Sequence, residues 1–198
     1  MPVELNDSAP ARIGDYILLR ILGEGGMGTA YLAKDVRIGR QVAIKTMKPE
    51  LASPATRERF LREAGAAAAI EHDNIVPIWH VGEADGSPFI VMPFLQGETL
   101  EARLKREPIT PLGMLLKVAL EVAEGLRAAH KKGLIHRDIK PANVWLEGDL
   151  TAPEVAERVR RCKILDFGLA RSMSGTDMQL TMSGTILGTP AYMAPEQA

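Results

Sequence analysis

Apolar and polar positions along the first half of the chain follow mostly the period of β-strands. Residues 16–22, 29–33 and 41–47 are short β-prone runs bounded by glycine or polar residues, and residues 89–92 form a fourth apolar run. A short glycine-rich stretch separates the first two runs. The pattern therefore predicts strand–turn–strand at the start of the chain, followed by further strands of the same kind.

Two stretches follow the helical period instead. Ser53 and Pro54 suit an N-cap and a first helical turn, and a core-facing stripe comes after them. The stripe consists of Phe60, Ala64 and Ala67. A longer helix is predicted from Thr110-Pro111 to about His130, with Gly133 as its stop. Its periodic positions are Leu115, Val118, Ala119, Val122, Leu126 and Ala129.

Composition narrows the class of protein. The 198 residues contain 24 Lys and Arg against 25 Asp and Glu, and 46% are hydrophobic. This balance indicates a globular protein and argues against a nucleic-acid binder that relies on bulk positive charge. The single cysteine, Cys162, suits a reducing compartment, and neither a signal peptide nor a membrane span is visible, so we expect a cytoplasmic protein. Residues 1–13 are predicted to be a flexible leader.

A glycine-rich motif lies between the first two predicted strands. Gly23, Gly25 and Gly28 have G-x-G-x-x-G spacing, which lets backbone N–H groups approach a phosphate closely. A dinucleotide-binding site would need a helix after these glycines, but a strand is predicted there. The motif thus indicates a phosphate-binding strand–turn–strand, with an ordinary glycine-rich hairpin as the alternative.

Residues 136–143, His-Arg-Asp-Ile-Lys-Pro-Ala-Asn, combine a base, a cation and a metal ligand. Asp138 could accept a proton from an attacking hydroxyl, and Lys140 could neutralise negative charge that develops nearby. Asn143 offers a carbonyl oxygen of the kind that Mg²⁺ prefers. Taken alone, the segment could also be a charged surface loop.

Several motifs together make the chain resemble a protein kinase. Residues 136–143 match the catalytic loop H-R-D-x-x-x-x-N, and Val-Ala-Ile-Lys at 42–45, Asp-Phe-Gly at 166–168 and Ala-Pro-Glu at 194–196 follow the kinase order. The resemblance covers about residues 14–198. Lys140-Pro141 is similar to the serine/threonine branch, and Gly-Gly-Met-Gly-Thr-Ala-Tyr-Leu-Ala at 25–33 looks most like its bacterial members.

The resemblance implies an α+β, bilobal fold with an antiparallel N-lobe sheet, one N-lobe helix and a mainly helical C-lobe. The implied division is an N-lobe at 14–92, a hinge at 93–97 and a partial C-lobe at 98–198. The C-lobe is expected to be incomplete, because the chain stops two residues after Glu196. Residues 147–161 are longer than the usual hairpin and are interpreted as a surface insertion.

Catalytic and metal-binding roles follow from the resemblance. Asp138 would orient and deprotonate the hydroxyl, Lys140 would neutralise charge, and Lys45 would hold phosphates. A helix glutamate would orient Lys45; Glu63 is the candidate and Glu58 the rival. The metal, Mg²⁺ or Mn²⁺, would be held by Asn143 and Asp166.

The ATP site implied by the resemblance includes three departures from the family pattern: Ala30 in place of valine, Pro93 in place of an acidic residue, and Trp145 in place of an aliphatic floor. Trp145 could stack under the base or fill the core, and both roles remain open. The hinge numbering allows a slip of one residue. The full set is Leu22, Gly23, Gly25, Gly28, Ala30, Ala43, Lys45, Met92, Pro93, Leu95 and Trp145.

The implied activity is transfer of the ATP γ-phosphoryl group to Ser or Thr hydroxyls of protein substrates, with autophosphorylation in a kinase–kinase pair. Thr189 would line the substrate site, and phosphate on Thr181 or Ser183 would pair with Arg137. The alternatives are a non-catalytic ATP-binding or scaffolding fragment and an unstable remnant with exposed apolar surface.

Overall fold

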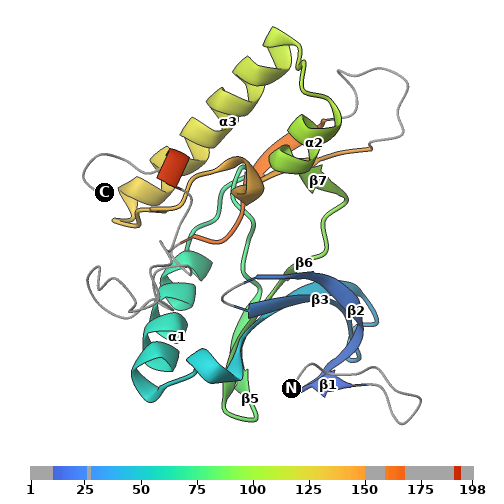
Figure 1. Ribbon diagram of the computed structural model, residues 1–198. Coiled ribbons are helices and arrows are strands. Elements are labelled where there is room, and N and C mark those ends of the chain that lie inside the picture. Colours follow the sequence, from blue (N-terminus) through green and yellow to red (C-terminus); the bar gives the residue numbers. More distant parts are fainter. Residues whose placement is uncertain (1–10, 26–27, 150–158, 168–189, 193–198) are drawn as a thin grey trace. The chain divides into compact units, whose positions relative to one another are not determined.

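The computed structural model describes residues 11–25, 28–149, 159–167 and 190–192. The chain divides into two compact units (Figure 1). The N-terminal unit comprises residues 1–69 and 77–95, and the C-terminal unit comprises residues 70–76 and 96–198. In the described part of the chain, no helix combines the length and apolar character needed to cross a membrane.

An antiparallel six-stranded sheet forms most of the N-terminal unit, with the strand order β1-β2-β3-β4-β6-β5. The strands are β1 (Arg12–Ile13), β2 (Tyr16–Glu24), β3 (Gly28–Asp35), β4 (Gln41–Met47), β5 (His80–Ala84) and β6 (Ser87–Pro93). The strands predicted at 16–22, 29–33, 41–47 and 89–92 are all confirmed, because strand-favouring residues there also pair with long antiparallel neighbours.

A two-residue turn connects β5 and β6. Asp85 and Gly86 have φ angles of 49° and 73°, which are the positive values that a type I′ hairpin requires at both central positions. Asp-Gly supplies them at low cost, since Gly has no Cβ and Asp tolerates the left-handed region. This turn fixes the register of the β5–β6 pair, in which Ala84 faces Ser87.

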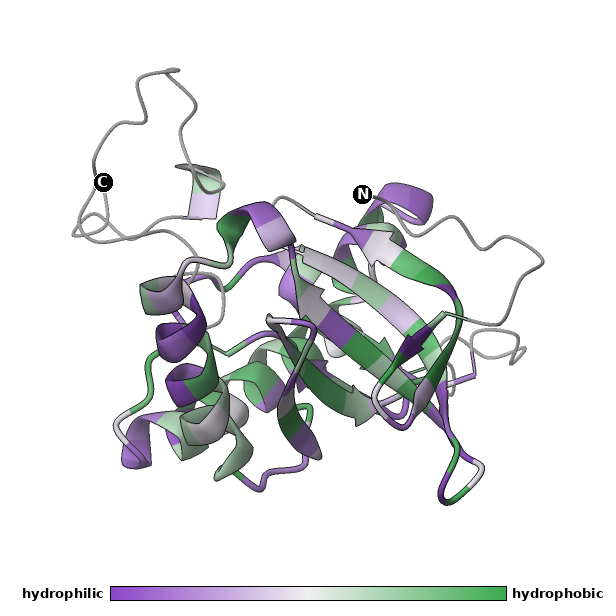
Figure 2. Ribbon diagram, turned by 90° about the horizontal axis from the view of Figure 1, so that it is seen from below, coloured by the Kyte–Doolittle hydropathy of each residue, from purple (hydrophilic) through white to green (hydrophobic). Residues whose placement is uncertain are grey.

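One core cluster of the N-terminal unit lies on one face of this sheet. Val42 and Ile44 of β4 are buried there in a cluster with residues of β2, β3 and β6. The members are Tyr16, Leu18, Ala33, Val42, Ile44, Phe89 and Val91. Because successive side chains of a strand point to opposite faces, Ala43 and Lys45 lie on the other face. Figure 2 shows apolar and polar residues side by side along these strands.

One short and one long helix complete the N-terminal unit: η1 (Pro49–Leu51) and α1 (Pro54–Ala68). The Ser53 side chain accepts a hydrogen bond from the Thr56 N–H at 3.2 Å, as its predicted cap role requires. The predicted stripe is confirmed, because its three residues are the buried ones of α1. The helix packs against β5 and β6.

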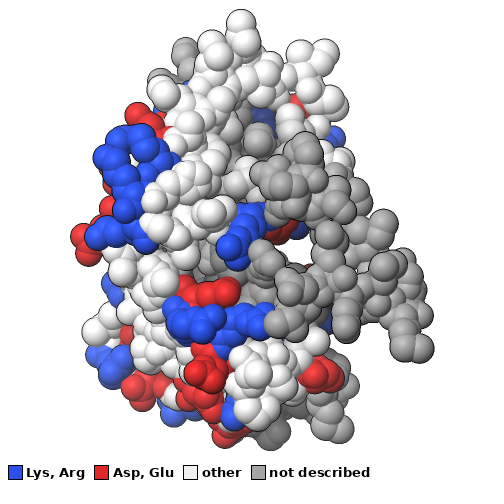
Figure 3. Space-filling model, turned by 90° about the vertical axis from the view of Figure 1, so that its left-hand side faces the viewer, with Lys and Arg blue, Asp and Glu red and all other residues white. Residues whose placement is uncertain are grey.

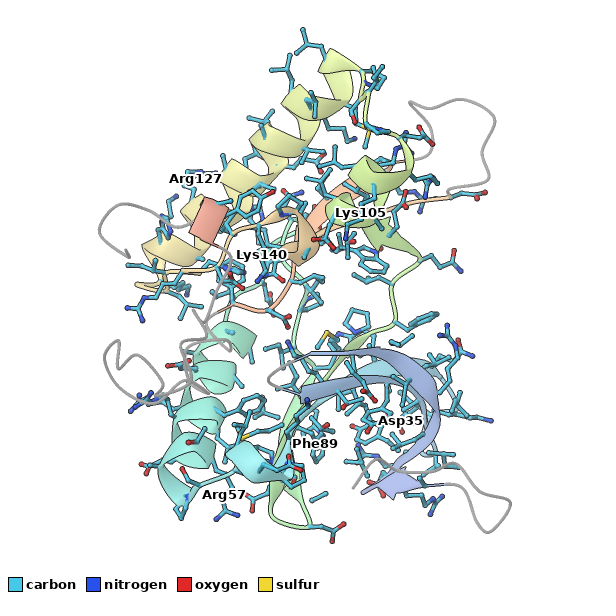
Figure 4. The ribbon with its side chains drawn as sticks, viewed as in Figure 1. Asp35, Arg57, Phe89, Lys105, Arg127 and Lys140 are labelled. Atoms are coloured by element: carbon cyan, nitrogen blue, oxygen red, sulfur yellow. The ribbon has the colours of Figure 1, made fainter. Side chains whose placement is uncertain are left out.

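Charged side chains join α1 to the β5–β6 hairpin. Arg57 Nη1 donates to the Gly86 carbonyl at 3.0 Å and lies 3.3 Å from Glu83 Oε1. Arg57 is labelled in Figure 4. Positive and negative side chains also lie next to one another on the face drawn in Figure 3, in keeping with the balanced composition.

The C-terminal unit combines a three-stranded antiparallel sheet, ordered β7-β8-β9, with helices. Its elements are β7 (Gly97–Thr99), α2 (Leu100–Arg106), α3 (Leu112–Lys131), η2 (Pro141–Asn143), β8 (Val144–Glu147), β9 (Arg161–Ile164) and η3 (Pro190–Tyr192). The second predicted helix is confirmed as α3, which ends two residues before Gly133.

The buried side of α3 is narrower than its apolar pattern suggests. Val118, Gly125 and Ala129 are buried, whereas Leu115, also among the periodic positions, is 42% exposed. The difference arises because β9 and the segment 70–76 meet the helix along a line that passes through Gly125.

The segment 70–76 is fixed to the C-terminal unit by a buried asparagine. Asn74 Nδ2 donates to the Cys162 carbonyl at 2.9 Å and to Glu121 Oε2 at 3.3 Å. The Asn74 carbonyl accepts from the Ile164 N–H at 2.8 Å. One side chain therefore ties this segment to both α3 and β9.

Some predictions fall outside the described residues. They concern Gly168, the possible phosphorylation sites Thr181 and Ser183, the substrate residue Thr189 and the Ala-Pro-Glu at 194–196. Most of the predicted insertion at 147–161 also lies there.

Candidate active site

The C-terminal unit gathers three of the predicted residues in one short segment. Lys140 is extended, with φ −155° and ψ 163°, and its Nζ lies 2.9 Å from Asp138 Oδ2. Extended backbone places side chains two positions apart on the same side, which is why the two charges meet. Lys140, labelled in Figure 4, directly precedes η2, which carries Asn143.

Asn143 is oriented by two hydrogen bonds from its amide nitrogen. Nδ2 donates to the Asp138 carbonyl at 2.8 Å and to Asp138 Oδ2 at 2.9 Å. Because the nitrogen is committed to Asp138, the side-chain oxygen is left to accept another partner. Asp138 Oδ2 in turn receives both Lys140 and Asn143, so its carboxylate is held by two donors.

The β8–β9 pairing brings Asp166 close to this segment. Val144 pairs with Ile164, and the Leu165 N–H donates to the Asn143 carbonyl at 2.9 Å. Asp166 follows immediately, with a φ of 58°, so the chain turns away from the strand at that residue. Asn143 and Asp166 therefore lie at the same end of the β8–β9 pair.

The donors present fit Mg²⁺ better than a metal that needs a protein cage. Within the described ranges, no group of three or more His, Cys, Asp or Glu is placed to hold a metal ion. The predicted ligands, the Asn143 amide oxygen and the Asp166 carboxylate, are hard oxygen donors of the kind that Mg²⁺ prefers, and two such donors would leave positions for phosphate oxygens and water.

His136 connects the segment that carries Asp138 to the end of β9, next to Asp166. Its Nε2–H donates to the Leu165 carbonyl at 2.7 Å, and its Nδ1 accepts from the Asp138 N–H at 3.3 Å. The ring contacts Phe167 edge to face, with ring centroids 4.7 Å apart. Burial lowers the pKa of His136, which keeps the ring neutral as both hydrogen bonds require.

The indole ring of Trp145 is held by one hydrogen bond from its ring nitrogen. Its indole Nε1–H donates to the Gln96 carbonyl at 3.2 Å, next to Gly97, which pairs with Glu147 of β8. A Cβ on Gly97 would overlap the Leu146 carbonyl oxygen, so only glycine allows this approach. The ring orientation is fixed by this bond; whether the ring faces a nucleotide base stays a prediction.

The N-terminal unit places the predicted nucleotide residues in two rows across three strands. Lys45 lies opposite Ala30 of β3 and Ile90 of β6. Ala43 lies between Leu32 and Met92 in the next row. These residues share the sheet face opposite the core cluster, and Lys45 is half-buried on it.

The three motif glycines differ in their surroundings. A Cβ on Gly28 would overlap the Thr46 carbonyl oxygen, so this glycine is required by strand packing. A Cβ on Gly23 or Gly25 would meet nothing within 4 Å. The Gly25 N–H donates to the Gly28 carbonyl at 3.0 Å. Leu22, which precedes the first of these glycines, is 37% exposed.

The remaining predicted residues of this unit are half-buried. Pro93 pairs with Val42 at the end of β6, and Leu95 is the last residue of the unit. Glu63 of α1 has a buried Oε2 for which the described residues provide no hydrogen-bond partner. Lys45 and Glu63 belong to the same unit, and their contact stays a prediction.

Several contacts that build the site leave no signal in the amino-acid sequence. His136 was recognised only as part of a motif, without its link to Leu165 and Phe167. The buried Arg103 of α2 was not identified either, because a lone arginine on a short helix is usually exposed. Its spacing of four residues from Glu107 was the available hint.

Comparison with known proteins identifies the family. A model of the protein kinase domain matches residues 16–198. The chain therefore belongs to the protein kinase domain family. The predicted kinase fold is confirmed by a crystal structure of the Mycobacterium tuberculosis PknI kinase domain, with 30% sequence identity and a TM-score of 0.68, over 87% of this chain and 70% of that one.

Similar relatives are bacterial serine/threonine kinases. The chain is 41% identical over 187 residues to serine/threonine-protein kinase pkn2 of Myxococcus xanthus, covering 93% of this chain and 22% of that protein. It is 36% identical over 198 residues to serine/threonine-protein kinase PknB of Mycobacterium tuberculosis, covering 96% of this chain and 30% of that protein. The chain thus spans less than a third of the length of these curated relatives.

Proposed function

We propose that the protein transfers the γ-phosphoryl group of ATP to Ser or Thr hydroxyls of proteins. The observation that carries the proposal is the arrangement around Asp138, whose carboxylate is held by Lys140 at 2.9 Å and by the Asn143 amide at 2.9 Å. A carboxylate fixed in this way can orient a hydroxyl and accept its proton, and the adjacent ammonium group can neutralise charge on the transferred phosphoryl group.

The metal-binding role belongs to Asn143 and Asp166. Mg²⁺ or Mn²⁺ held by these two residues would supply positive charge that neutralises the phosphates of the nucleotide. The hydrogen bonds of Asn143 Nδ2 to Asp138 leave its oxygen as the ligand atom, so the general base and the metal ligand are oriented by the same contact.

The N-terminal unit supplies the nucleotide contacts in this proposal. Lys45 would hold the α- and β-phosphates, and the open backbone at Gly23 and Gly25 leaves room for phosphate that Gly28, packed on Thr46, does not. Ala30, Ala43, Leu22 and the hinge residues Met92, Pro93 and Leu95 would contact the base, and Trp145 would form its floor.

Pairing of Lys45 with Glu63 would accompany activation. The buried Oε2 of Glu63, for which the described residues provide no hydrogen-bond partner, supports this pairing, because a buried carboxylate oxygen gains most from a cationic partner. Phosphate on Thr181 or Ser183, paired with Arg137, is the proposed trigger. Autophosphorylation in a kinase–kinase pair and a cytoplasmic location complete the proposal.

The test compares wild type with Asp138→Asn in the full-length protein. With radiolabelled ATP and Mg²⁺, wild type should label itself, and Asp138→Asn should lose at least about 10²-fold of that rate, the usual contribution of a general base. Thermal shift with Mg-ATP should be similar for both proteins, because the nucleotide contacts remain.

Two results would decide against the proposal. A thermal shift without phosphoryl transfer in wild type would indicate the alternative, a non-catalytic ATP-binding or scaffolding module. Loss of both transfer and thermal shift in Asp138→Asn would show that Asp138 has a structural role instead.

A further inference from the structure

A buried group of charges lies in the C-terminal unit, where β7 continues into α2. Arg103 is the single buried residue of α2, and its side chain is 1% exposed. Glu98 of β7 is also buried, with a side chain 9% exposed. We call Glu98, Arg103, Arg106 and Glu107 the α2 charge cluster.

The pairing within the α2 charge cluster is uneven. Arg106 takes both oxygens of Glu98, with Nη2 at 2.7 Å from Oε1 and Nη1 on Oε2. Arg103 Nη2 binds Glu107 Oε2 at 2.8 Å, but its Nη1 remains 4.0 Å from Glu98 Oε1. Arg103 Nε and Nη1 have no hydrogen-bond partner among the described residues.

Packing alone does not account for an arginine at this position. Burying a cation and leaving two donors unpaired is costly, whereas an apolar side chain of similar volume is often neutral or stabilising in such a place. Glu98 has Arg106 as its partner, and Glu107 is 36% exposed, so neither depends on Arg103 for neutralisation. The distinctive property of Arg103 is its rigid fork, which reaches towards Glu98 at one end of α2 and Glu107 at the other.

The helix that carries Arg103 packs against the site. It contacts η2, β7 and β8. The register of β7 on β8 places Glu98 opposite Leu146, and β8 begins directly after Asn143. The position of α2 therefore sets the position of η2, and with it the Asn143 amide.

We propose that Arg103 is a positioning residue for metal binding. Its guanidinium fixes the β7–α2 corner against which η2 packs, and so holds the Asn143 side chain where its oxygen can bind the metal of a Mg-nucleotide. This inference rests on the proposed function, because it assigns Arg103 a part in the same reaction.

The main variant is Arg103→Met, which keeps the volume and removes the fork. Arg103→Lys keeps the charge without the fork. The matched control is Lys105→Met on the same helix: Lys105, labelled in Figure 4, is 74% exposed and pairs with Glu101 at 3.0 Å. All three are made in the full-length protein.

The first measurement needs no ligand. Hydrogen exchange of the peptide that contains η2, where the Asn143 N–H donates to the Lys140 carbonyl at 2.8 Å, should be faster in Arg103→Met and unchanged in Lys105→Met. The second is the Mg²⁺ dependence of transfer at saturating ATP. Groups that orient a metal ligand change metal affinity by about 10–100-fold, so the half-saturating Mg²⁺ concentration should rise by at least about tenfold in Arg103→Met.

The rate at saturating Mg²⁺ should return to within about twofold of wild type, because a metal bound to the Asn143 oxygen would hold the amide that also orients Asp138. A general structural defect would lower that rate as well, and Arg103→Lys should lie between wild type and Arg103→Met. The inference would be overturned if Arg103→Met showed the same Mg²⁺ dependence and the same hydrogen exchange as wild type. It would also be overturned if Lys105→Met changed both quantities as much as Arg103→Met does. If Arg103→Met does not fold, wild-type behaviour of Arg103→Lys overturns it. Wild-type protein that neither transfers phosphate nor binds Mg-nucleotide removes the proposed function and this inference together.

Discussion

Two glycines of α3 should respond in opposite ways to the same substitution. A Cβ on Gly113 would meet nothing within 4 Å, whereas a Cβ on Gly125 would lie 2.9 Å from Ile164 Cδ1 and 3.0 Å from the Asn74 carbonyl oxygen. Alanine restricts the unfolded chain in both cases. The comparison therefore isolates the contact that α3 makes with its neighbours.

The magnitudes follow from these distances. Gly113→Ala should stabilise the protein by about 0.4–1 kcal/mol, since alanine loses less conformational entropy on folding. Gly125→Ala gains a similar amount, but overpacking costs about 1–3 kcal/mol, so a net loss of about 1 kcal/mol is expected. Ile164 Cδ1 can move, but the Asn74 carbonyl cannot move cheaply, because it accepts the Ile164 N–H at 2.8 Å.

The assay is thermal unfolding followed by tryptophan fluorescence. Trp79 belongs to the N-terminal unit and Trp145 to the C-terminal unit, and they are the two tryptophans of the chain. In a Trp79→Phe background the signal reports the C-terminal unit. The two alanine variants should differ by about 2 kcal/mol, or about 4–8 °C in Tm for a chain of this size. Equal shifts in the same direction would refute the packing of α3 described above.

Two further predictions concern titratable groups of the C-terminal unit. Burial lowers the pKa of His136 in the folded protein, so His136 binds a proton more readily in the unfolded chain than in the folded one. The free energy of unfolding should therefore be constant above about pH 7 and should decrease as the pH falls below the reference pKa of about 6.5. The decrease should be at most about 1.4 kcal/mol per pH unit. Urea unfolding between pH 5 and 8 measures this slope, and a His136→Asn variant with the same slope would contradict the assignment. Burial, and then Glu121, raises the pKa of the Cys162 thiol to about 12; a thiol reagent at about pH 8 should therefore label the unfolded protein but not the folded one. Labelling of native protein at the rate of a free thiol would show that Cys162 is accessible.

The longer strands, the two long helices and the family can be predicted from local sequence. Strand runs such as 41–47 and the capped helix after Ser53 follow from local periodicity and local hydrogen bonding, which neighbouring residues settle among themselves. The catalytic segment at 136–143 was recognisable because its chemistry requires particular residue types at fixed spacing. Contacts within that segment, such as Lys140 with Asp138, follow from extended backbone alone.

The long-range contacts that support these residues are visible only in the folded chain. The Trp145 bond to Gln96, and the contact of Gly125 with Asn74, join positions that are 49 and 51 residues apart in the sequence. The burial of Arg103 likewise depends on β7, β8 and η2 meeting around a short helix. Periodicity records which side of an element is apolar, but which neighbour covers that side, and which polar groups are buried with it, is fixed by the pairing of distant segments.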